Sequence, residues 1–433
     1  MIKKLLIIGY VWPEPNSSAA GTRMLQLIEL FISQQWSVVF ASAAALSEHR
    51  ADLNSLGVEE KIIALNDSSF NEYIKDLQPH AVLFDRFFTE EQFGWRVEQV
   101  CPQTLRILDT EDLHSLRKAR FKLLRQSQQN LGKESDRQCV GPVLVDPAEL
   151  YAYMATDDMA QREIAAIFRC DLTLMISKFE IEFLTHFFSV PEKLLHYCPF
   201  ITQKNSNGDA LKDFVSREHF VAIGNFRHEP NWDSVLYLKH AIWPLIRAQL
   251  PQAELHIYGA YPPPKTTQLH NAKEGFCIKG WADDANAVMR QSRVCLAPLR
   301  FGAGIKGKLM DAMRNGTPSV TTSIGAEGMS GGLEWCGFIE NTATKFADTA
   351  VKLYEDQTQW QKAQTQGTVI LQTYFGAHDY AQLFVDRLNE LQENIDAERK
   401  QNFIGAMLRH HTLKSTQYMS QWIEAKNKHS PLN

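Results

Sequence analysis

Short apolar runs that alternate with amphipathic segments constrain the fold of this chain more than any other feature. The runs that we expect to be strands are 4–9, 36–41, 61–65, 81–85, 105–109 and 171–177, followed by 220–224, 254–259, 276–279, 294–298, 319–322 and 337–339. Helix-like stretches such as 22–34 and 90–100 separate them. Continuously apolar strands with helices between them are typical of parallel sheets covered on both faces. The sequence therefore predicts an α/β fold.

The alternation pauses at residues 202–216, a polar stretch with a turn signal at Asn207-Gly208. The first expected strand before this stretch, 4–9, and the first expected strand after it, 220–224, both end in a glycine. We therefore expect two Rossmann-like domains, residues 1–201 and 217–375, that face each other across a cleft and are joined by this linker. Beyond them, apolar residues recur at helical spacing, so residues 376–433 are expected to form C-terminal helices.

Length and composition disfavour several classes of protein. The 433 residues, 44% of them hydrophobic, suffice for two or three domains, and a net charge of −5 argues against a nucleic-acid-binding protein. No apolar run approaches the roughly 20 residues of a transmembrane helix, and the run at 5–8 is too short for a signal peptide. The seven cysteines lack C-x-x-C spacing, so we expect no metal site and buried thiols in a reducing cytoplasm.

One strand–turn–helix unit carries the strongest functional signal. The strand at 294–298 leads into Gly302 and Gly304, and a helix is predicted to start near Ile305. Parallel sheets bind ligands beyond the carboxyl ends of their strands, and glycines let the backbone approach a ligand closely. A helix N-terminus offers free N–H groups and a positive dipole to an anion. This unit therefore predicts a receptacle for a phosphorylated ligand.

Two lysines strengthen that prediction. Lys306 and Lys308 fall in the expected first turn of the helix. A cation there is unfavourable by about 0.3–1 kcal/mol, so we expect an anionic partner to offset the cost. Asp311 follows about one turn later, and Gly316 ends the helix. A solvated basic turn before a packing helix is the alternative interpretation.

The segment from Gly302 to Met313 resembles the donor-binding region of the family-four glycosyltransferases with the GT-B fold, in the branch whose motif reads G-A-G-I-(K/R)-x-K-x-x-E-A-M. Residues 220–231, 280–284 and 162–177 are similar to other landmarks of that branch. The resemblance implies an enzyme that moves a sugar from a nucleoside-diphosphate sugar to a glycan, lipid-linked or other acceptor. It also implies retention of anomeric configuration, with no metal or other cofactor.

The resemblance assigns roles to single residues. The family's first motif glutamate is replaced by Ala303, and its basic residues after the first strand of the second domain are replaced by Asn225 and Pro230. Neutralisation of the diphosphate must then rest on the lysines and Arg227. The residues expected to bind the donor are Gly21, Gly224, Arg227, Gly302, Gly304, Ile305, Lys306, Lys308 and Asp311.

Residues 109–117 follow a predicted strand and are rich in groups suited to acid–base or sugar-hydroxyl chemistry. His114 matches the family histidine that lies beside the donor sugar, so the resemblance implies that it positions and polarises that sugar. Catalytic roles are accordingly expected for His114, Lys308 and Asp311, without a protein nucleophile. Asp85, Asp112 and Arg117 are acceptor-side candidates; an Asp–Arg pair, a helix cap and a solvated helix charge are the respective alternatives.

Two other functions remain open at the level of the sequence. A sugar-nucleotide epimerase with the GT-B fold would need a well-placed acid pair, which is not evident. A non-catalytic sugar-nucleotide-binding protein is suggested by Ala303 and Asn225. The mildly basic residues 396–433 are expected to pack on the N-terminal domain, as the last helix of GT-B enzymes does, or to contact an anionic membrane. Contact with an anionic membrane would place this protein, which we expect to be cytoplasmic, at the inner face of the membrane.

Overall fold

The computed structural model describes residues 2–131, 138–201, 211–376 and 378–429. The strands of the first half are β1 (Lys4–Gly9), β2 (Ser37–Ser42), β3 (Glu59–Ile62), β4 (Ala81–Asp85), β5 (Leu105–Asp109), β6 (Leu172–Met175) and β7 (Leu195–Tyr197). Its helices are α1 (Ala19–Ser33), α2 (Ser69–Leu77), α3 (Phe87–Val100), α4 (His114–Gln129), α6 (Pro147–Ala155), α7 (Asp158–Arg169) and α8 (Lys178–Phe188).

The strands of the second half are β8 (Glu218–Ile223), β9 (Leu255–Tyr258), β10 (Phe276–Gly280), β11 (Ser292–Ala297), β12 (Ser319–Thr321) and β13 (Gly337–Ile339). Its helices are α9 (Glu229–Tyr237), α10 (Trp243–Gln249), α11 (Pro264–Thr267), α12 (Ala285–Gln291), α13 (Gly307–Arg314), α14 (Ser323–Ala326), α15 (Ala343–Glu355) and α16 (Gln357–Ile370). The C-terminal helices are α17 (Tyr380–Gln401) and α18 (Phe403–His429).

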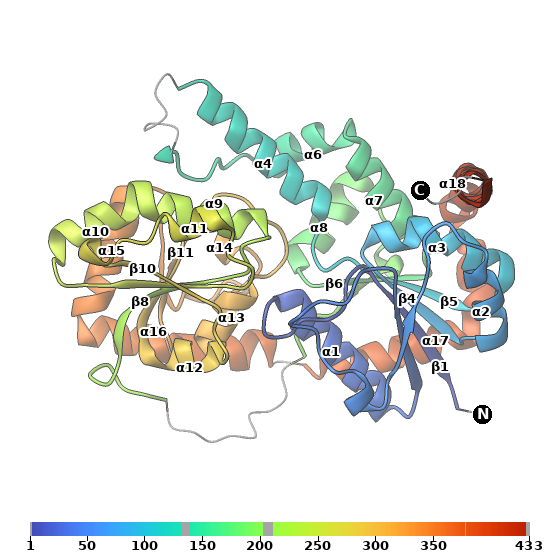
Figure 1. The fold of residues 1–433 in the computed structure, drawn as a ribbon, viewed down its shortest axis with the longest axis horizontal. Helices are drawn as coiled ribbons and strands as arrows, with labels where there is room; N and C mark the ends of the chain where they lie inside the picture. The colour runs from blue at the N-terminus through green and yellow to red at the C-terminus, as the bar shows by residue number, and fades with distance from the viewer. Residues whose placement is uncertain (1, 132–137, 202–210, 377, 430–433) are drawn as a thin grey trace.

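Two parallel sheets, one in each half of the chain, organise the molecule (Figure 1). The seven-stranded sheet has the order β3-β2-β1-β4-β5-β6-β7, and the six-stranded sheet has the order β10-β9-β8-β11-β12-β13. The predicted α/β fold with two Rossmann-like halves and C-terminal helices is therefore confirmed. Residues 202–210 of the expected linker lie outside the described residues.

Alternate residues of the central strands enter apolar cores on opposite faces of each sheet. In β1, Leu6 and Ile8 belong to one cluster, whereas Leu5 and Ile7 belong to another. Phe220 and Val221 of β8 divide in the same way. Burial on both faces explains why these strands read as continuous apolar runs in the sequence.

Two local differences from the sequence prediction have simple causes. Strand β7 was not predicted, because its three residues are only half-buried at the edge of the sheet and form no apolar run. Helix α13 begins at Gly307 and not near Ile305. Gly304 is left-handed (φ 64°) and Lys306 is extended (φ −97°, ψ 97°), so neither can belong to the helix.

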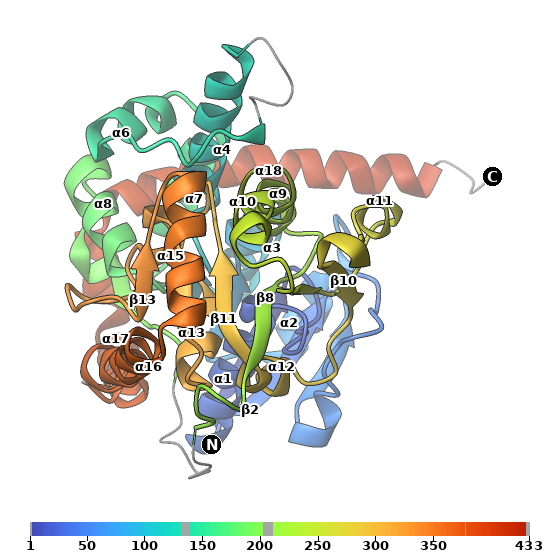
Figure 2. The same cartoon turned by 90° about the vertical axis from the view of Figure 1, so that its left-hand side faces the viewer.

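The C-terminal helices return to the first half of the chain. Helix α18 packs against α3 and α7 (Figure 2), and α17 contacts β5. The guanidinium of Arg399 donates to both carboxylate oxygens of Asp171 at 2.8 Å, and Asn402 Nδ2 donates to the carbonyl oxygen of Phe168 at 2.8 Å. In the described part of the chain, no helix is both long enough and apolar enough to span a membrane.

Candidate active site

The carboxyl ends of the two sheets meet at the boundary between the halves of the chain. Asn225, which follows β8, donates from Nδ2 to Ser17 Oγ at 3.0 Å. Tyr261, which follows β9, donates from its hydroxyl to Glu14 Oε1 at 2.7 Å. Both acceptors lie in the loop after β1. Since loops at these strand ends are where parallel sheets bind ligands, the candidate site lies at this boundary.

Lys308 is the cation best placed to meet an anion. Its Nζ donates to Asn231 Oδ1 at 2.7 Å, and no carboxylate of the described residues forms an ion pair with it. A Cβ on Gly224 would lie 2.9 Å from this Nζ, so the glycine lets the ammonium reach the end of β8. Burial lowers the pKa of Lys308 to about 8. A desolvated ammonium with only a neutral partner favours an anionic ligand.

Lys306 has different surroundings from Lys308. Its side chain is 8% exposed, and its Nζ donates to the carbonyl oxygen of Gly304. Burial lowers its pKa to about 8, although the charges of Glu327 and Glu180 act in the opposite direction. Lys306 therefore belongs to a compensated charge cluster, and the prediction that its ammonium faces a phosphate is not supported by these contacts.

The glycine-rich turn is held by the first half of the chain. Glu180 Oε1 accepts hydrogen bonds from the backbone N–H groups of Gly304 (2.8 Å) and Leu113 (3.1 Å). Arg120 donates to the carbonyl oxygen of Gly302 (2.8 Å) and to both carboxylate oxygens of Glu327 (2.6 and 2.8 Å). The amide of Gly304, one of the residues expected to bind the donor, therefore already has a partner in the Glu180 carboxylate.

The first turn of α13 still offers backbone donors. Gly307 and Lys308 are its first two residues, and the N–H groups of a first turn have no partner within the helix. Gly307 approaches the first half closely, since a Cβ on it would lie 2.4 Å from Ala19 Cβ. Asp311 lies one turn after Lys308; burial raises its pKa, and its Oδ1 is 3.5 Å from Arg314 Nη1.

Three other residues that were predicted to bind the sugar-nucleotide donor have surroundings that differ from one another. Ile305 is buried in an apolar cluster, where its side chain stabilises the turn. A Cβ on Gly21 would lie 2.4 Å from the backbone of Glu14, so this glycine closes the loop after β1. The guanidinium of Arg227 lies 3.5 Å from the ring centroid of Tyr261. These two side chains line a cavity of about 650 Å³ together with Phe226, Glu229, Trp232, Pro262, Pro263 and Lys265.

His114 begins helix α4 on the opposite side of the boundary. Arg117 Nη2 donates to its Nδ1 at 3.0 Å, and because arginine can only donate, the proton of a neutral ring resides on Nε2. Nε2 lies 3.5 Å from Asp112 Oδ1. Burial lowers the pKa of His114 to about 3, and the charge of Arg117 adds to this effect. The imidazole is therefore neutral near pH 7 and presents Nε2–H as a donor.

Glu163 of α7 fixes the position of His114. Its Oε1 accepts from the backbone N–H of His114 and its Oε2 from that of Ser115, both at 2.9 Å. This carboxyl group thus binds the positive N-terminus of α4. Burial raises the pKa of Glu163 to about 7, against the lowering effect of these hydrogen bonds.

Buried carboxyl groups gather at the carboxyl ends of β4 and β5. Asp85 Oδ2 accepts from the backbone N–H of Tyr10 at 3.0 Å, and Asp109 pairs with Arg23 at 2.9 Å. Asp85 Oδ1 and Glu111 Oε1 are buried without a hydrogen-bond partner among the described residues. Burial raises the pKa of both Asp85 and Glu111. Unpartnered buried oxygens of this kind suit hydroxyl groups of a ligand.

His228 connects the two sides of the site. It directly precedes α9, and desolvation at the boundary lowers its pKa. The charges of Arg117, Asp112 and Lys308 also lie near enough to affect this pKa. The Asp112 carboxylate in turn pairs with Arg117. His228 thus lies near Lys308 on one side of the boundary and near Asp112 and Arg117, the neighbours of His114, on the other.

Sequence reasoning missed several residues of this boundary. It did not single out His228, Glu180 or Glu327, and it assigned no role to Glu163, because buried acids and a loop histidine carry no spacing signal. Trp281, which directly follows β10, stacks on His49 with the ring centroids 3.8 Å apart.

Comparison with known protein families gives a match in the second half of the chain. Residues 217–356 match a family model described as "Glycosyl transferases group 1". A comparison with curated proteins gives no match.

Solved structures show the same fold at low sequence identity. Sucrose-phosphate synthase from Thermosynechococcus elongatus is 14% identical with a TM-score of 0.58, over 90% of this chain and 99% of that chain. HepE from Anabaena in complex with UDP is 10% identical with a TM-score of 0.61, over 90% and 100%. A glycosyltransferase from Rickettsia africae is 10% identical with a TM-score of 0.60, over 91% and 99%.

Proposed function

We propose that this protein moves a sugar from a nucleoside-diphosphate sugar to an acceptor, with retention of anomeric configuration, because residues 217–356 match the glycosyl transferases group 1 and the chain has the GT-B fold. The acceptor would be a glycan, a lipid-linked saccharide or a related molecule. The reaction would need no metal or other cofactor, because cationic side chains and helix N–H groups would bind the diphosphate.

The observation that carries this proposal is the uncompensated ammonium of Lys308 at the end of β8. A diphosphate would supply the missing negative charge there. The N–H groups of Gly307 and Lys308 would bind the same group from the first turn of α13. Asp311, one turn further on, would accept hydrogen bonds from the ribose hydroxyls.

His114 would act on the sugar. Its neutral ring offers Nε2–H, which can donate to a hydroxyl of the transferred sugar and hold it against the leaving phosphate. No protein nucleophile is required, because a phosphate oxygen of the donor would accept the proton of the attacking hydroxyl. Because His114 is neutral, it also adds no positive charge that would attract the diphosphate away from Lys308.

The acceptor would bind beside His114. Tyr10 is 48% exposed, its ring lies 5.6 Å from that of Phe88, and Phe88 lies 5.5 Å from His114. Aromatic rings next to unpartnered carboxyl oxygens suit the apolar face and the hydroxyls of a sugar. Asp85, Asp112 and Arg117 are therefore proposed to position the acceptor.

Donor binding is the decisive experiment. Thermal shift measured with UDP, GDP, ADP and their sugars should show a rise in Tm for one nucleotide, because a ligand that binds the folded state stabilises it. Product analysis would follow with that donor. Transfer to a saccharide acceptor supports the proposal, whereas turnover of donor without acceptor would indicate an epimerase or a hydrolase. Binding without any turnover would indicate a non-catalytic protein.

We also propose that the protein contacts the inner face of an anionic membrane through α18. Phe403, Tyr418, Met419 and Trp422 are between 58% and 76% exposed on this helix. Such side chains can enter the interface of a bilayer next to basic residues. Flotation with vesicles that contain anionic lipid tests this point, and a protein that stays at the bottom of the gradient at low salt would contradict it.

A further inference from the structure

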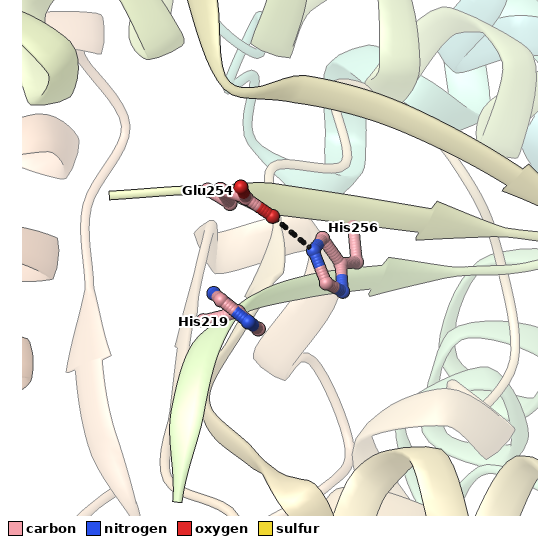
Figure 3. Close-up of side chains that lie close together, drawn as sticks. All are labelled: His219, Glu254 and His256. Atoms are coloured by element: carbon pink, nitrogen blue, oxygen red, sulfur yellow. Dashed lines mark hydrogen bonds and ion pairs between the residues drawn. The ribbon is translucent and has the colours of Figure 1, made fainter. Parts of the chain in front are cut away.

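A second cluster of ligand-type side chains lies far from the candidate active site. His219 belongs to β8, His256 belongs to β9, and Glu254 directly precedes β9. The three side chains point toward one another (Figure 3), and one ligand atom of each lies within 4.8 Å of the others. His256 Nε2 is 2.7 Å from Glu254 Oε2, and the two imidazole centroids are 4.2 Å apart.

The backbone is adapted to bring the cluster together. His219 has φ +60°, a left-handed conformation that is uncommon for a residue other than glycine and unexpected inside a strand. The β8–β11 pairing skips His219: Glu218 and Phe220 have partners in β11, and the residue between them has none. A strained residue that persists in a short strand points to a role for its side chain.

The chemistry of the three groups matches one class of ligand. Two imidazoles and one carboxylate form a donor set that binds Zn²⁺ with bonds of about 2.0–2.2 Å, which places tetrahedral ligand atoms roughly 3.4 Å apart. The present contacts bracket that separation, so small side-chain rotations suffice to admit an ion. All three residues are half-buried, which leaves a fourth position open to water.

We propose that His219, Glu254 and His256 form a binding site for a divalent transition-metal ion of the Zn²⁺ class at the starting ends of β8 and β9. The ion would replace the hydrogen bond between Glu254 and His256 and would join the two strands. The site lies at the opposite end of β8 from Gly224, roughly 16 Å away for five residues of extended strand. Its role is therefore structural, and it is independent of the proposed transferase chemistry.

Metal titration tests this site directly. Protein freed of metal with a chelator is titrated with Zn²⁺ by calorimetry and with Co²⁺ by visible absorption. We expect one equivalent of Zn²⁺ per chain, a Co²⁺ spectrum of nitrogen and oxygen ligands, and a Tm that rises by several degrees with Zn²⁺. His256→Ala and Glu254→Gln should each weaken Zn²⁺ binding at least tenfold and abolish the rise in Tm.

Controls separate this site from other ligands. His378→Ala removes an exposed histidine outside the cluster and should leave Zn²⁺ binding unchanged. A Cys139→Ser background removes the exposed thiol. The metal-free Tm of each variant confirms that it folds. Either no saturable Zn²⁺ binding by the wild-type chain, or equal binding by His256→Ala, Glu254→Gln and the wild type, would overturn the proposal.

Discussion

Replacement of Lys308 by methionine should raise the stability of the ligand-free protein and weaken its binding of the donor. In the free protein, burial lowers the pKa of Lys308 from 10.5 to about 8. That shift corresponds to a cost on the order of 3 kcal/mol for keeping the ammonium charged at neutral pH. Lys308→Met removes this cost but also the hydrogen bond to Asn231, which is worth about 1 kcal/mol. The ligand-free variant should therefore be more stable than the wild type, with a Tm higher by roughly 2 °C or more.

The same substitution should weaken donor binding. A hydrogen bond to a charged group contributes about 1.5–3 kcal/mol, which corresponds to a roughly 10- to 150-fold loss of affinity for the nucleoside diphosphate. Turnover should fall at least tenfold. Lys308→Arg keeps its positive charge above pH 8. As the pH rises past 8, the affinity of the wild type for the nucleoside diphosphate should therefore fall more steeply than the affinity of Lys308→Arg.

Lys306→Met is the matched control, since it removes the other lysine of the same turn. The loss of Lys306 removes a cation beside Glu180 and the hydrogen bond to the carbonyl oxygen of Gly304, whereas Glu327 keeps its pair with Arg120, so this variant should have a lower Tm. Calorimetric binding and thermal denaturation of both variants provide the measurements. An unchanged donor affinity in Lys308→Met, or a loss of stability as large as that of Lys306→Met, would refute this account of the two lysines.

Three further changes test the remaining parts of the site. Arg120→Met removes the ion pair between Arg120 and Glu327 at the boundary and should cost about 3 kcal/mol, seen as a lower Tm, with a more open shape in small-angle scattering. An unchanged scattering profile would argue that Arg120 does not hold the two halves of the chain together. His114→Ala should lower kcat by roughly 100-fold while donor affinity stays within threefold, because one donor to the reacting sugar is lost; equal effects on both would point to donor binding alone. Asp311→Asn should raise the KM for the donor about tenfold with little change in kcat, and a donor that lacks the ribose hydroxyls should be insensitive to this change.

The sequence by itself determined the layout of the fold. Strands buried on both faces must be apolar throughout, so β1, β4 and β5 formed continuous apolar runs in the sequence, and all three were placed to the residue. The turn from Gly302 to Lys308 was equally legible, because a tight turn at a helix N-terminus requires specific residue types. Half-buried β7 left no such pattern.

Only the tertiary structure decided how the charges of that turn are used. Lys306 and Lys308 are two residues apart and identical in type, yet one lies among Glu180 and Glu327 and the other meets only the amide of Asn231. Glu180 lies on α8 and accepts the hydrogen bond of the Gly304 amide, a contact between residues 124 positions apart. The meeting of His219 with His256 is likewise set by strand order. Electrostatic energy depends on distance and burial, and packing between distant segments fixes both, so no local pattern could have predicted them.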